Sequence, residues 1–259
     1  MACSNTGSSP NGAPTVALES DLDLIRLLDI LGYDKAWIGE HHSTGWENIG
    51  SPEVFIAAAA QGTRHIRLGT GVIQLGLHNP LVLLDRMILL DHLTRGRAMF
   101  GIGVGGGLPS DLKVFGLDRA KAGERFEQSI GTILRLLSSD KPIDEKTDWF
   151  ELHNAALQLQ PYSKPHMRVA VASTDPRNLE PMGRLGGQVL TGPIPERVPE
   201  MVKHLKRGVK RGRPRRFIPA DNALRSSSTR ARSIESATRL APATPTSSPC
   251  CPTISPSHS

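Results

Sequence analysis

The alternation that decides the fold lies in residues 67–103, RLGTGVIQLGLHNPLVLLDRMILLDHLTRGRAMFGIG. Its first part, Arg67–Ile73, is rich in apolar and small residues and predicts a buried strand. Pro80–Leu93 is long enough for a helix and begins with proline, which favours the first helical position. Gly96 ends that helix, and residues 97–103 predict a second strand. A strand, a helix and a strand in this order indicate a parallel β-α-β unit.

The same alternation extends to both sides of this unit. Upstream, the sequence predicts a helix over 18–31, a strand over 36–39 and a helix that opens at Ser51-Pro52 and runs to Ala60; downstream, it predicts a helix over 124–137, a strand over 167–173, a helix over 177–185 and a strand over 188–191. Five apolar strands joined by helices indicate an α/β fold with a parallel sheet. Both a doubly wound sheet and part of a (β/α)8 barrel fit this pattern.

The alternation breaks between Lys141 and Pro161. Residues 149–152 and 156–159 alternate apolar and polar side chains, as the strands of a half-buried hairpin do. We therefore predict a small hairpin inserted before the next parallel strand.

Composition excludes several classes of protein. Of the 259 residues, 38% are hydrophobic and 22% are charged, which is ordinary for a soluble protein. The longest apolar run, residues 54–60, is far shorter than the roughly 20 residues of a membrane span. The first 30 residues show no signal-peptide pattern. The cysteines (Cys3, Cys250 and Cys251) lie at the two ends and suit neither a disulfide framework nor a metal site. We expect a cytoplasmic protein with no metal and no membrane partner.

The positive net charge belongs to the C-terminal tail. Residues 203–259 contain 12 of the 31 lysines and arginines but only two acidic residues, so the rest of the chain is acidic overall. The end of the chain is rich in Ser, Thr and Pro and has no apolar periodicity. We predict a disordered tail over 207–259, a disordered N-terminus over 1–14 and a folded unit over 15–206. Phe217 is the only aromatic residue of the tail, so base stacking is disfavoured and nucleic-acid binding is a minor alternative.

The sharpest local motif is Glu40-His41-His42, at the end of the strand that contains Trp37. Ionisable groups at the carboxyl end of a parallel strand lie where α/β folds place their sites. Neighbouring residues of a strand face opposite ways, so the two histidines suit a metal poorly. One of them is either a general acid or base near neutral pH or a hydrogen-bonded structural residue.

Two further strand ends are candidates for ligand contact. Gly101, Gly103 and Gly106 form a G-x-G-x-x-G pattern, but Leu108-Pro109-Ser110 interrupts the helix that a dinucleotide fingerprint requires. The alternative is a loop whose backbone approaches another group closely. Ser173-Thr174-Asp175 joins a strand to a helix, and this start is either an anion site or a simple helix cap.

Taken together, these segments resemble the luciferase-like flavin-dependent monooxygenases, the family of the bacterial luciferase α-subunit. The resemblance is strongest to members similar to the limonene and alkanal monooxygenases. It covers residues 15 to 192, and the stretches that carry it are 37–42, 68–72, 85–97, 100–103 and 113–116.

The resemblance implies a (β/α)8 barrel, of which strands two to six are recognisable here. It implies an FMN-dependent monooxygenase in which reduced FMN, supplied by a separate flavin reductase, reacts with O2. The resulting flavin hydroperoxide oxidises a small organic substrate, and a homo-oligomer is implied as well; a deazaflavin stays an open alternative. His41 takes the family's catalytic position. Gly71 and Val72 take the position of a cis peptide against the flavin, and Ser173 and Thr174 that of the phosphate site.

The sequence departs from the family in three places. Val104 stands where luciferase has an arginine near the phosphate, residues 4–10 hold no first strand, and the tail begins where a seventh strand should follow. An abrupt change of composition inside a domain is typical of a truncated or frameshifted product. A non-catalytic remnant of the enzyme, or a partner subunit, is therefore the alternative to an active monooxygenase.

Overall fold

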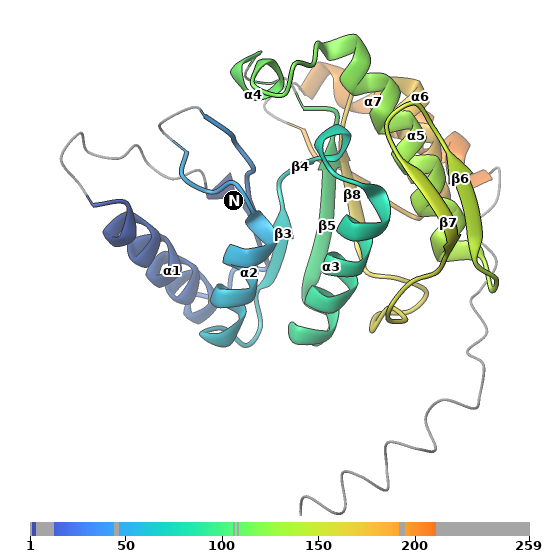
Figure 1. The fold of residues 1–259 in the computed structure, drawn as a ribbon. Coiled ribbons are helices and arrows are strands. Elements are labelled where there is room, and N and C mark those ends of the chain that lie inside the picture. The colour runs from blue at the N-terminus through green and yellow to red at the C-terminus, as the bar shows by residue number, and fades with distance from the viewer. Residues whose placement is uncertain are drawn as a thin grey trace, which may run out of the picture. The chain divides into compact units, whose positions relative to one another are not determined.

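The computed structural model describes residues 2–3, 13–43, 47–105, 107, 109–191 and 195–210. The chain divides into two compact units, Met1–Phe217 and Ile218–Ser259. All the described residues belong to the first unit, so the fold below is that of the first unit alone (Figure 1).

Seven of the described strands form one parallel sheet in which neighbours follow each other in chain order. Across the sheet they are β1 (Ala2–Cys3), β2 (Lys35–Ile38), β3 (Arg67–Thr70), β5 (Ala98–Gly103), β8 (Arg168–Ala172) and β9 (Gln188–Val189), and β4 (Ile73–Gln74) also pairs with β5. A doubly wound sheet reverses its strand order at a switch point, whereas a barrel places each strand beside the previous one. The unreversed order therefore favours the barrel over the doubly wound alternative.

Helices connect the successive strands and cover the sheet (Figure 1). They are α1 (Pro14–Ile30), α2 (Pro52–Gln61), α3 (Pro80–Leu93), α4 (Pro109–Lys113), α5 (Arg119–Ser138), α6 (Pro176–Arg184) and α7 (Val198–Lys210), with short 3₁₀ turns η1 (Leu75–Leu77) and η2 (Pro195–Arg197). Helix α3 matches the predicted helix residue for residue. Its start is well specified, because the Asn79 side chain accepts hydrogen bonds from the N–H groups of Leu81 and Val82.

The core lies between the sheet and these helices. All six residues of β5 are buried, and Phe100 on β5 and Phe126 on α5 are 1% and 0% exposed. The register aligns the strand ends, since Ile38 pairs with Thr70, and Gly103 pairs with both Gln74 and Ala172. The carboxyl ends of β2, β3, β4, β5 and β8 therefore meet at one edge of the sheet.

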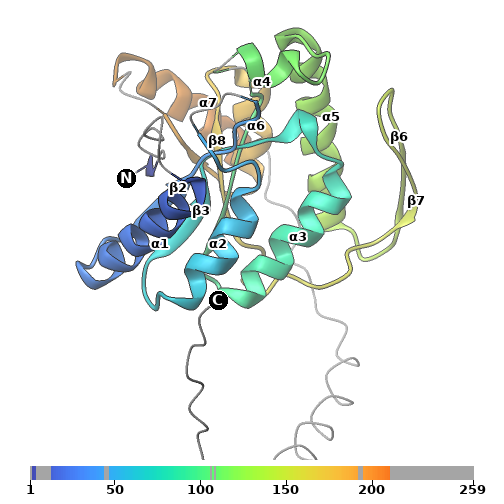
Figure 2. The same ribbon diagram turned by 60° about the vertical axis from the view of Figure 1, so that its left-hand side comes forward.

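The predicted hairpin is present, but its strands are shifted. It consists of β6 (Ile143–Lys146) and β7 (Glu151–Ala155), which pair antiparallel outside α5 (Figure 2). The predicted second strand, 156–159, is wrong. Only Ile143, Leu152 and Ala155 of the hairpin strands are buried, and a register irregularity lies between Ile143 and Glu145. The alternation in the sequence is therefore too weak to locate the strands.

Two expectations, about the first strand and about the segment around Pro109, need correction. A first strand exists, because Ala2 and Cys3 pair with Trp37 and Ile38, but two residues are too few to show a pattern in the sequence. Helix α4 begins at Pro109, since a proline at the first position starts a helix rather than interrupting it.

The predicted limits of the folded unit, 15 and 206, are also too narrow. Helix α1 begins at Pro14, and α7 continues to Lys210. Arg207 and Lys210 lie in the last turn of α7, where positive charge is favourable, rather than in a tail. Of the two predicted disordered segments, residues 4–12 and 211–259 lie outside the described residues, and so does most of the basic stretch considered for nucleic acid.

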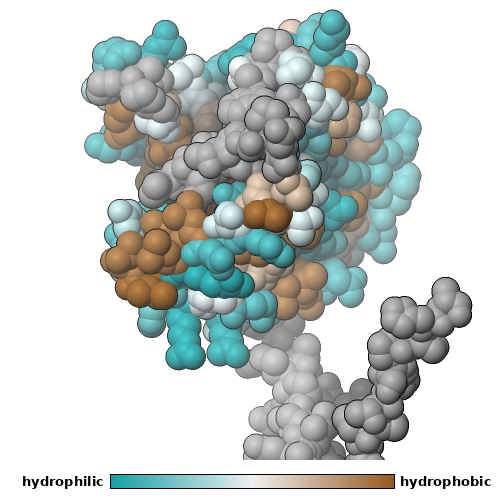
Figure 3. All heavy atoms as spheres, turned by 90° about the vertical axis from the view of Figure 1, so that its left-hand side faces the viewer, coloured by the Kyte–Doolittle hydropathy of each residue, from teal (hydrophilic) through white to brown (hydrophobic). Residues whose placement is uncertain are grey.

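The side of the unit that carries α1 exposes apolar surface (Figure 3). On α1 and just after it, Leu27, Ile30 and Leu31 are 50%, 80% and 62% exposed. Among the residues that the structure describes, no helix combines the length and the apolar character needed to cross a bilayer.

Asp29 ties the end of α1 to the segment before β3. Its carboxylate accepts hydrogen bonds from the backbone N–H groups of Arg64, His65 and Ile66, at 2.8, 2.8 and 2.6 Å. Burial raises the pKa of Asp29, but these three hydrogen bonds outweigh it and hold the pKa below its ordinary value. The stabilisation is therefore complete above about pH 4 and is lost as the pH falls through the lowered pKa.

We accordingly expect Asp29→Ala to destabilise the protein strongly near neutral pH and progressively less as the pH falls through the lowered pKa of Asp29, because protonation then removes the same stabilisation from the wild type. Urea midpoints of both proteins over this range test the expectation. Asp23→Ala is the control, because the side chain of Asp23 on the same helix is 72% exposed. A loss of stability for Asp29→Ala that does not depend on pH would contradict the prediction.

Candidate functional site

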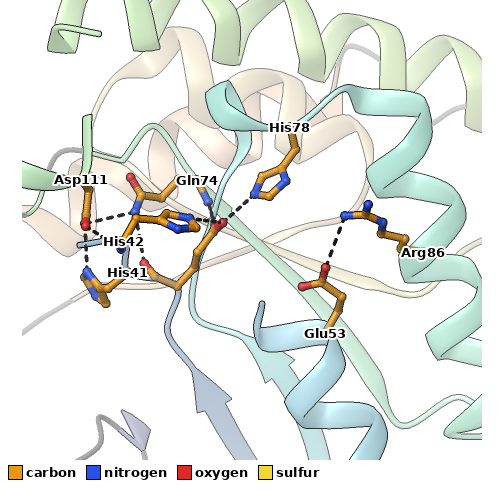
Figure 4. A network of polar contacts seen from close by, with 8 residues as sticks. His41, His42, Glu53, Gln74, His78, Arg86 and Asp111 are labelled. Carbon is orange, nitrogen blue, oxygen red and sulfur yellow. Dashed lines mark hydrogen bonds and ion pairs between the residues drawn. The ribbon is translucent and has the colours of Figure 1, made fainter. Parts of the chain in front are cut away.

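His41 lies just after β2 and has a carboxylate at each ring nitrogen, and Figure 4 shows the one from Asp111. Its Nδ1 is 2.9 Å from Oδ2 of Asp111, and its Nε2 is 2.9 Å from Oε2 of Glu47. The side chain of His41 is 23% exposed, whereas that of Asp111 is 1% exposed. The ring is therefore held in orientation by a buried carboxylate and can exchange a proton with a neighbour on either side.

Asp111 connects His41 to two other segments. From α4, its Oδ1 accepts the backbone N–H of His42 at 3.0 Å, and its Oδ2 accepts a hydrogen bond from Nε2 of Gln74 at 3.1 Å. Gln74, the last residue of β4, also donates from Nε2 to the carbonyl of Glu40 at 3.1 Å. These bonds join the end of β2, the end of β4 and α4 in one polar cluster.

Glu40 is the second buried carboxylate of the cluster. Its Oε1 lies 3.0 Å from Nε2 of His42 and 2.6 Å from Nε2 of His78, and its Oε2 accepts the backbone N–H of Gln74 at 2.6 Å. The rings of His41 and His42 thus face different carboxylates, as the predicted opposite orientation requires. A separate pair, Arg86 and Glu53 at 3.6 Å, links α3 to α2 beside the cluster (Figure 4).

A cavity of about 790 Å³ opens at the same edge of the sheet. Strand ends and the loops after them line one part, and α5 and α6 line the rest. The lining residues are Val72, Gly103, Val104, Gly105, Gly107, Arg119, Ala120, Gly123, Glu124, Glu127, Ala172, Ser173, Thr174, Asp175, Arg177 and Asn178. The cavity therefore brings together three of the predicted cofactor-binding residues: Val72, Ser173 and Thr174.

The Gly71–Val72 peptide bond is cis, as the resemblance implied. Gly71 donates its N–H to the carbonyl of Ile38 at 2.6 Å, and this bond holds the cis segment against the end of β2. Val72 packs over Gly103, where a Cβ would lie 2.7 Å from a Val72 methyl carbon. The glycine at 103 thus leaves room for Val72 at the cavity.

His41 is outside the cavity lining but is linked to it through the cluster. The Gln74 side chain lies against Gly105, because a Cβ at Gly105 would be 2.4 Å from Oε1 of Gln74. Since Gln74 also binds Asp111, the contacts run from the cavity wall through Gln74 and Asp111 to His41.

The start of α6 differs from what the anion argument assumed. The Ser173 hydroxyl accepts hydrogen bonds from the N–H of Asp175 and from Nδ2 of Asn178, at 3.1 and 3.0 Å. The Asp175 carboxylate caps the helix by accepting the N–H of Arg177 at 2.9 Å, and Pro176 has no N–H. The donors of the first turn are therefore already paired within the chain, and the idea of free N–H groups at this position is wrong. Thr174 is exposed at the cavity.

Sequence reasoning singled out His41 but missed most of the other residues of the polar cluster around it. Asp111, Gln74, His78 and Glu47 carry no motif of their own. Asp111 follows Pro109-Ser110, and this signal indicates only a helix start. Tertiary folding brings these four residues to the end of β2.

The chain is similar to known proteins in sequence and in fold. A family model described as luciferase-like monooxygenase matches residues 1–246. The chain belongs to this family.

Two curated relatives are similar over most of the chain. The 4-hydroxyprotoasukamycin monooxygenase of Streptomyces nodosus subsp. asukaensis is 46% identical over 187 residues, which cover 72% of this chain and 49% of that protein. The limonene 1,2-monooxygenase of Rhodococcus erythropolis is 41% identical over 192 residues, which cover 73% of this chain and 49% of that protein. The chain thus spans about half the length of the curated relatives it matches.

Solved structures agree on the fold. A monooxygenase from Streptomyces bottropensis matches with a TM-score of 0.73 at 22% identity, covering 92% of this chain and 77% of that one. The oxygenating constituent of 3,6-diketocamphane monooxygenase from Pseudomonas putida, in complex with FMN, matches with a TM-score of 0.66 at 19% identity, covering 82% and 62%. The predicted luciferase-like barrel is confirmed, with β2, β3, β5, β8 and β9 as strands two to six.

Proposed function

We propose that this chain is the oxygenase component of an FMN-dependent monooxygenase that acts on a small organic substrate. The observation that carries the proposal is the cavity at the carboxyl ends of the strands. Its lining includes Val72 of the cis peptide together with Ser173 and Thr174, and contacts run from it through Gln74 and Asp111 to His41. The match to the luciferase-like monooxygenase family and the names of two relatives, both monooxygenases, support it.

The residues present fit a flavin. The cavity volume of about 790 Å³ falls in the range of small-molecule and cofactor sites. Gly103 and Gly105 leave room for the side chains of Val72 and Gln74 at the cavity wall, and a Cβ at Gly107, which also lines the cavity, would meet no atom within 4 Å. Asn178, 4% exposed, lines the cavity, and its buried Oδ1 has no hydrogen-bond partner in the described part of the chain. We assign Gly71 and Val72 to contact with the ring system and Ser173 and Thr174 to the phosphate end.

When bound, reduced FMN supplies the two electrons that let one atom of O2 enter the substrate while the other leaves as water. The chain's own residues bind, orient and move protons. Val72 and the glycines shape the wall against the ring. Asp111 holds the imidazole of His41 from Nδ1, so that Nε2 and its neighbour Glu47 can exchange a proton at the site.

A separate flavin reductase is part of the proposal. Two similar proteins have names that describe a component of a larger system: the oxygenase component of a trigonelline monooxygenase from Acinetobacter baylyi and the oxygenating constituent of 3,6-diketocamphane monooxygenase. The exposed apolar side chains of α1 are compatible with association into a homo-oligomer.

Flavin binding with and without a blocked cavity tests the proposed function. Gly123 and Gly131 both lie on α5, and a Cβ at either position meets no atom within 4 Å, but only Gly123 lines the cavity. We expect Gly123→Trp to weaken FMN binding at least about tenfold, whereas Gly131→Trp leaves it unchanged. Titration of FMN into each purified chain, followed by flavin fluorescence, measures this.

Turnover completes the test. With a flavin reductase, NADH and a panel of small cyclic and aliphatic substrates, mass spectrometry after incubation under ¹⁸O2 should find one labelled oxygen atom in the product. Binding of FMN without any oxygenated product would favour a non-catalytic relative. Equal FMN binding by Gly123→Trp and Gly131→Trp would show that the flavin does not use this cavity.

A further inference from the structure

The charged side chains that line the cavity are unevenly balanced. Arg119 and Arg177 are the basic ones, and Glu124, Glu127 and Asp175 are the acidic ones. A phosphate is a dianion near neutral pH, so three carboxylates beside two guanidinium groups give a poor electrostatic environment for it. The affinity of the cavity for a phosphate therefore depends on these charged side chains as well as on the start of α6.

Arg177 is engaged by carboxylates on two elements. Its Nη2 and Nε lie 2.8 and 3.2 Å from Oδ2 of Asp175, at the start of α6. Its Nη1 lies 3.1 Å from Oε1 of Glu127, on α5. The hydrogen bonds from Arg177 lower the pKa of Asp175, so this carboxylate stays charged at neutral pH. The guanidinium that a phosphate would use is thus already shared by two anions.

The same cavity offers a better partner for hydroxyl groups than for a phosphate. Asn178 donates from Nδ2 to Ser173, and its Oδ1 is buried without a partner in the described part of the chain. A buried acceptor of this kind is stabilised by a ligand O–H, and the polyol chain common to riboflavin and FMN carries such groups. The contact is available to both flavins and does not distinguish them.

We propose that Asp175 and Glu127 compete with the flavin phosphate for Arg177 and thereby set the preference of this cavity between FMN and riboflavin. The inference rests on the proposed function and assigns specificity to two carboxylates at the site. The ion pairs of Arg177 are exposed or partly exposed, because the Arg177 side chain is 72% exposed and those of Asp175 and Glu127 are 35% and 39% exposed. Such pairs exchange their partners readily. Phosphate binding then requires Arg177 to leave its carboxylates.

Dissociation constants for FMN and riboflavin, measured on the same full-length variants, test the proposal. Asp175→Asn preserves the helix cap, because asparagine caps as well as aspartate. Glu127→Gln keeps a helix-favouring side chain on α5. We expect either change to tighten FMN binding about threefold to fivefold, in line with the weak coupling of partly exposed pairs, and to leave riboflavin binding unchanged. Arg177→Gln should weaken FMN binding without affecting riboflavin.

Glu124→Gln is the matched control for general charge. Glu124 lines the same cavity but pairs with Lys121 at 3.1 Å rather than with Arg177, so its removal should change the ratio of the two affinities less. Melting curves confirm that each variant is folded, and the two single variants test the proposal independently. Weaker FMN binding in Glu127→Gln, or an unchanged FMN-to-riboflavin ratio in both carboxylate variants, overturns the inference alone. Failure of both flavins to bind the wild type and every variant overturns the proposed function and this inference with it.

Discussion

Replacing His41 with alanine is expected to lower the proposed monooxygenase turnover about a hundredfold, at the lower end of the range for loss of a general acid or base. His41 is the one member of the Glu40-His41-His42 motif whose ring lies between Asp111 and Glu47. Alanine removes the group that can hold a proton there but leaves the cavity lining untouched, because His41 is not part of it. Steady-state turnover with saturating reduced flavin, together with the FMN dissociation constant, measures the effect.

Two variants make this result specific. His42→Ala should have a smaller effect on turnover, because the His42 ring faces Glu40 and packs edge-on against Phe115 at 5.2 Å. Asp111→Asn keeps a side chain of the same shape and should shift the pH profile of turnover, since it changes the charge beside Nδ1 of His41. Full activity in His41→Ala, with activity lost in His42→Ala, would reverse the assignment of the two histidines.

Replacing Gly101 with alanine is expected to destabilise the fold by about 3 kcal/mol or more, at the upper end for overpacking a core. A Cβ at Gly101 would lie 2.0 Å from the carbonyl oxygen of Thr70 and 3.1 Å from the Trp37 ring. The neighbour is backbone in the adjacent strand, so it cannot move aside as a flexible side chain does. The Thr70 hydroxyl also bonds the N–H and the carbonyl of Gly101, at 2.9 and 2.7 Å, and these bonds keep the two strands close.

The same substitution at Gly131 provides the control. Gly131 lies within α5 with no atom within 4 Å of a Cβ, so alanine there should stabilise the protein by about 0.5–1 kcal/mol through helix propensity. Urea unfolding of the two alanine variants and the wild type compares them directly. Equal stability of Gly101→Ala and the wild type would show that the strands can separate without cost.

Local signals were sufficient for most of the elements. Helix α3 was predicted at its observed bounds because Pro80 and Gly96 mark its ends, and both act through their own backbone conformation. The two-residue β1 and the half-exposed β6 were missed or misplaced, since pairing with another segment, rather than a pattern of their own, makes them strands. The choice between a doubly wound sheet and a barrel likewise required the order of the strands, which no single segment contains.

The glycine-rich stretch 101–106 likewise shows what the sequence could determine about the site and what required the fold. Their spacing suggested a dinucleotide fingerprint or a close backbone approach, and the contacts of Gly101 and Gly103 with Thr70 and Val72 support the second. His41 and the Gly71–Val72 peptide could be named from short contiguous motifs, because the residues that identify them are neighbours in the chain. Asp111, Gln74 and Arg177 acquire their roles from partners 70, 37 and 50 positions away. Contacts over such separations arise only when the chain folds and brings strand ends and helices together. The folded chain, and not a local sequence pattern, therefore determines the polar cluster and the charge of the cavity.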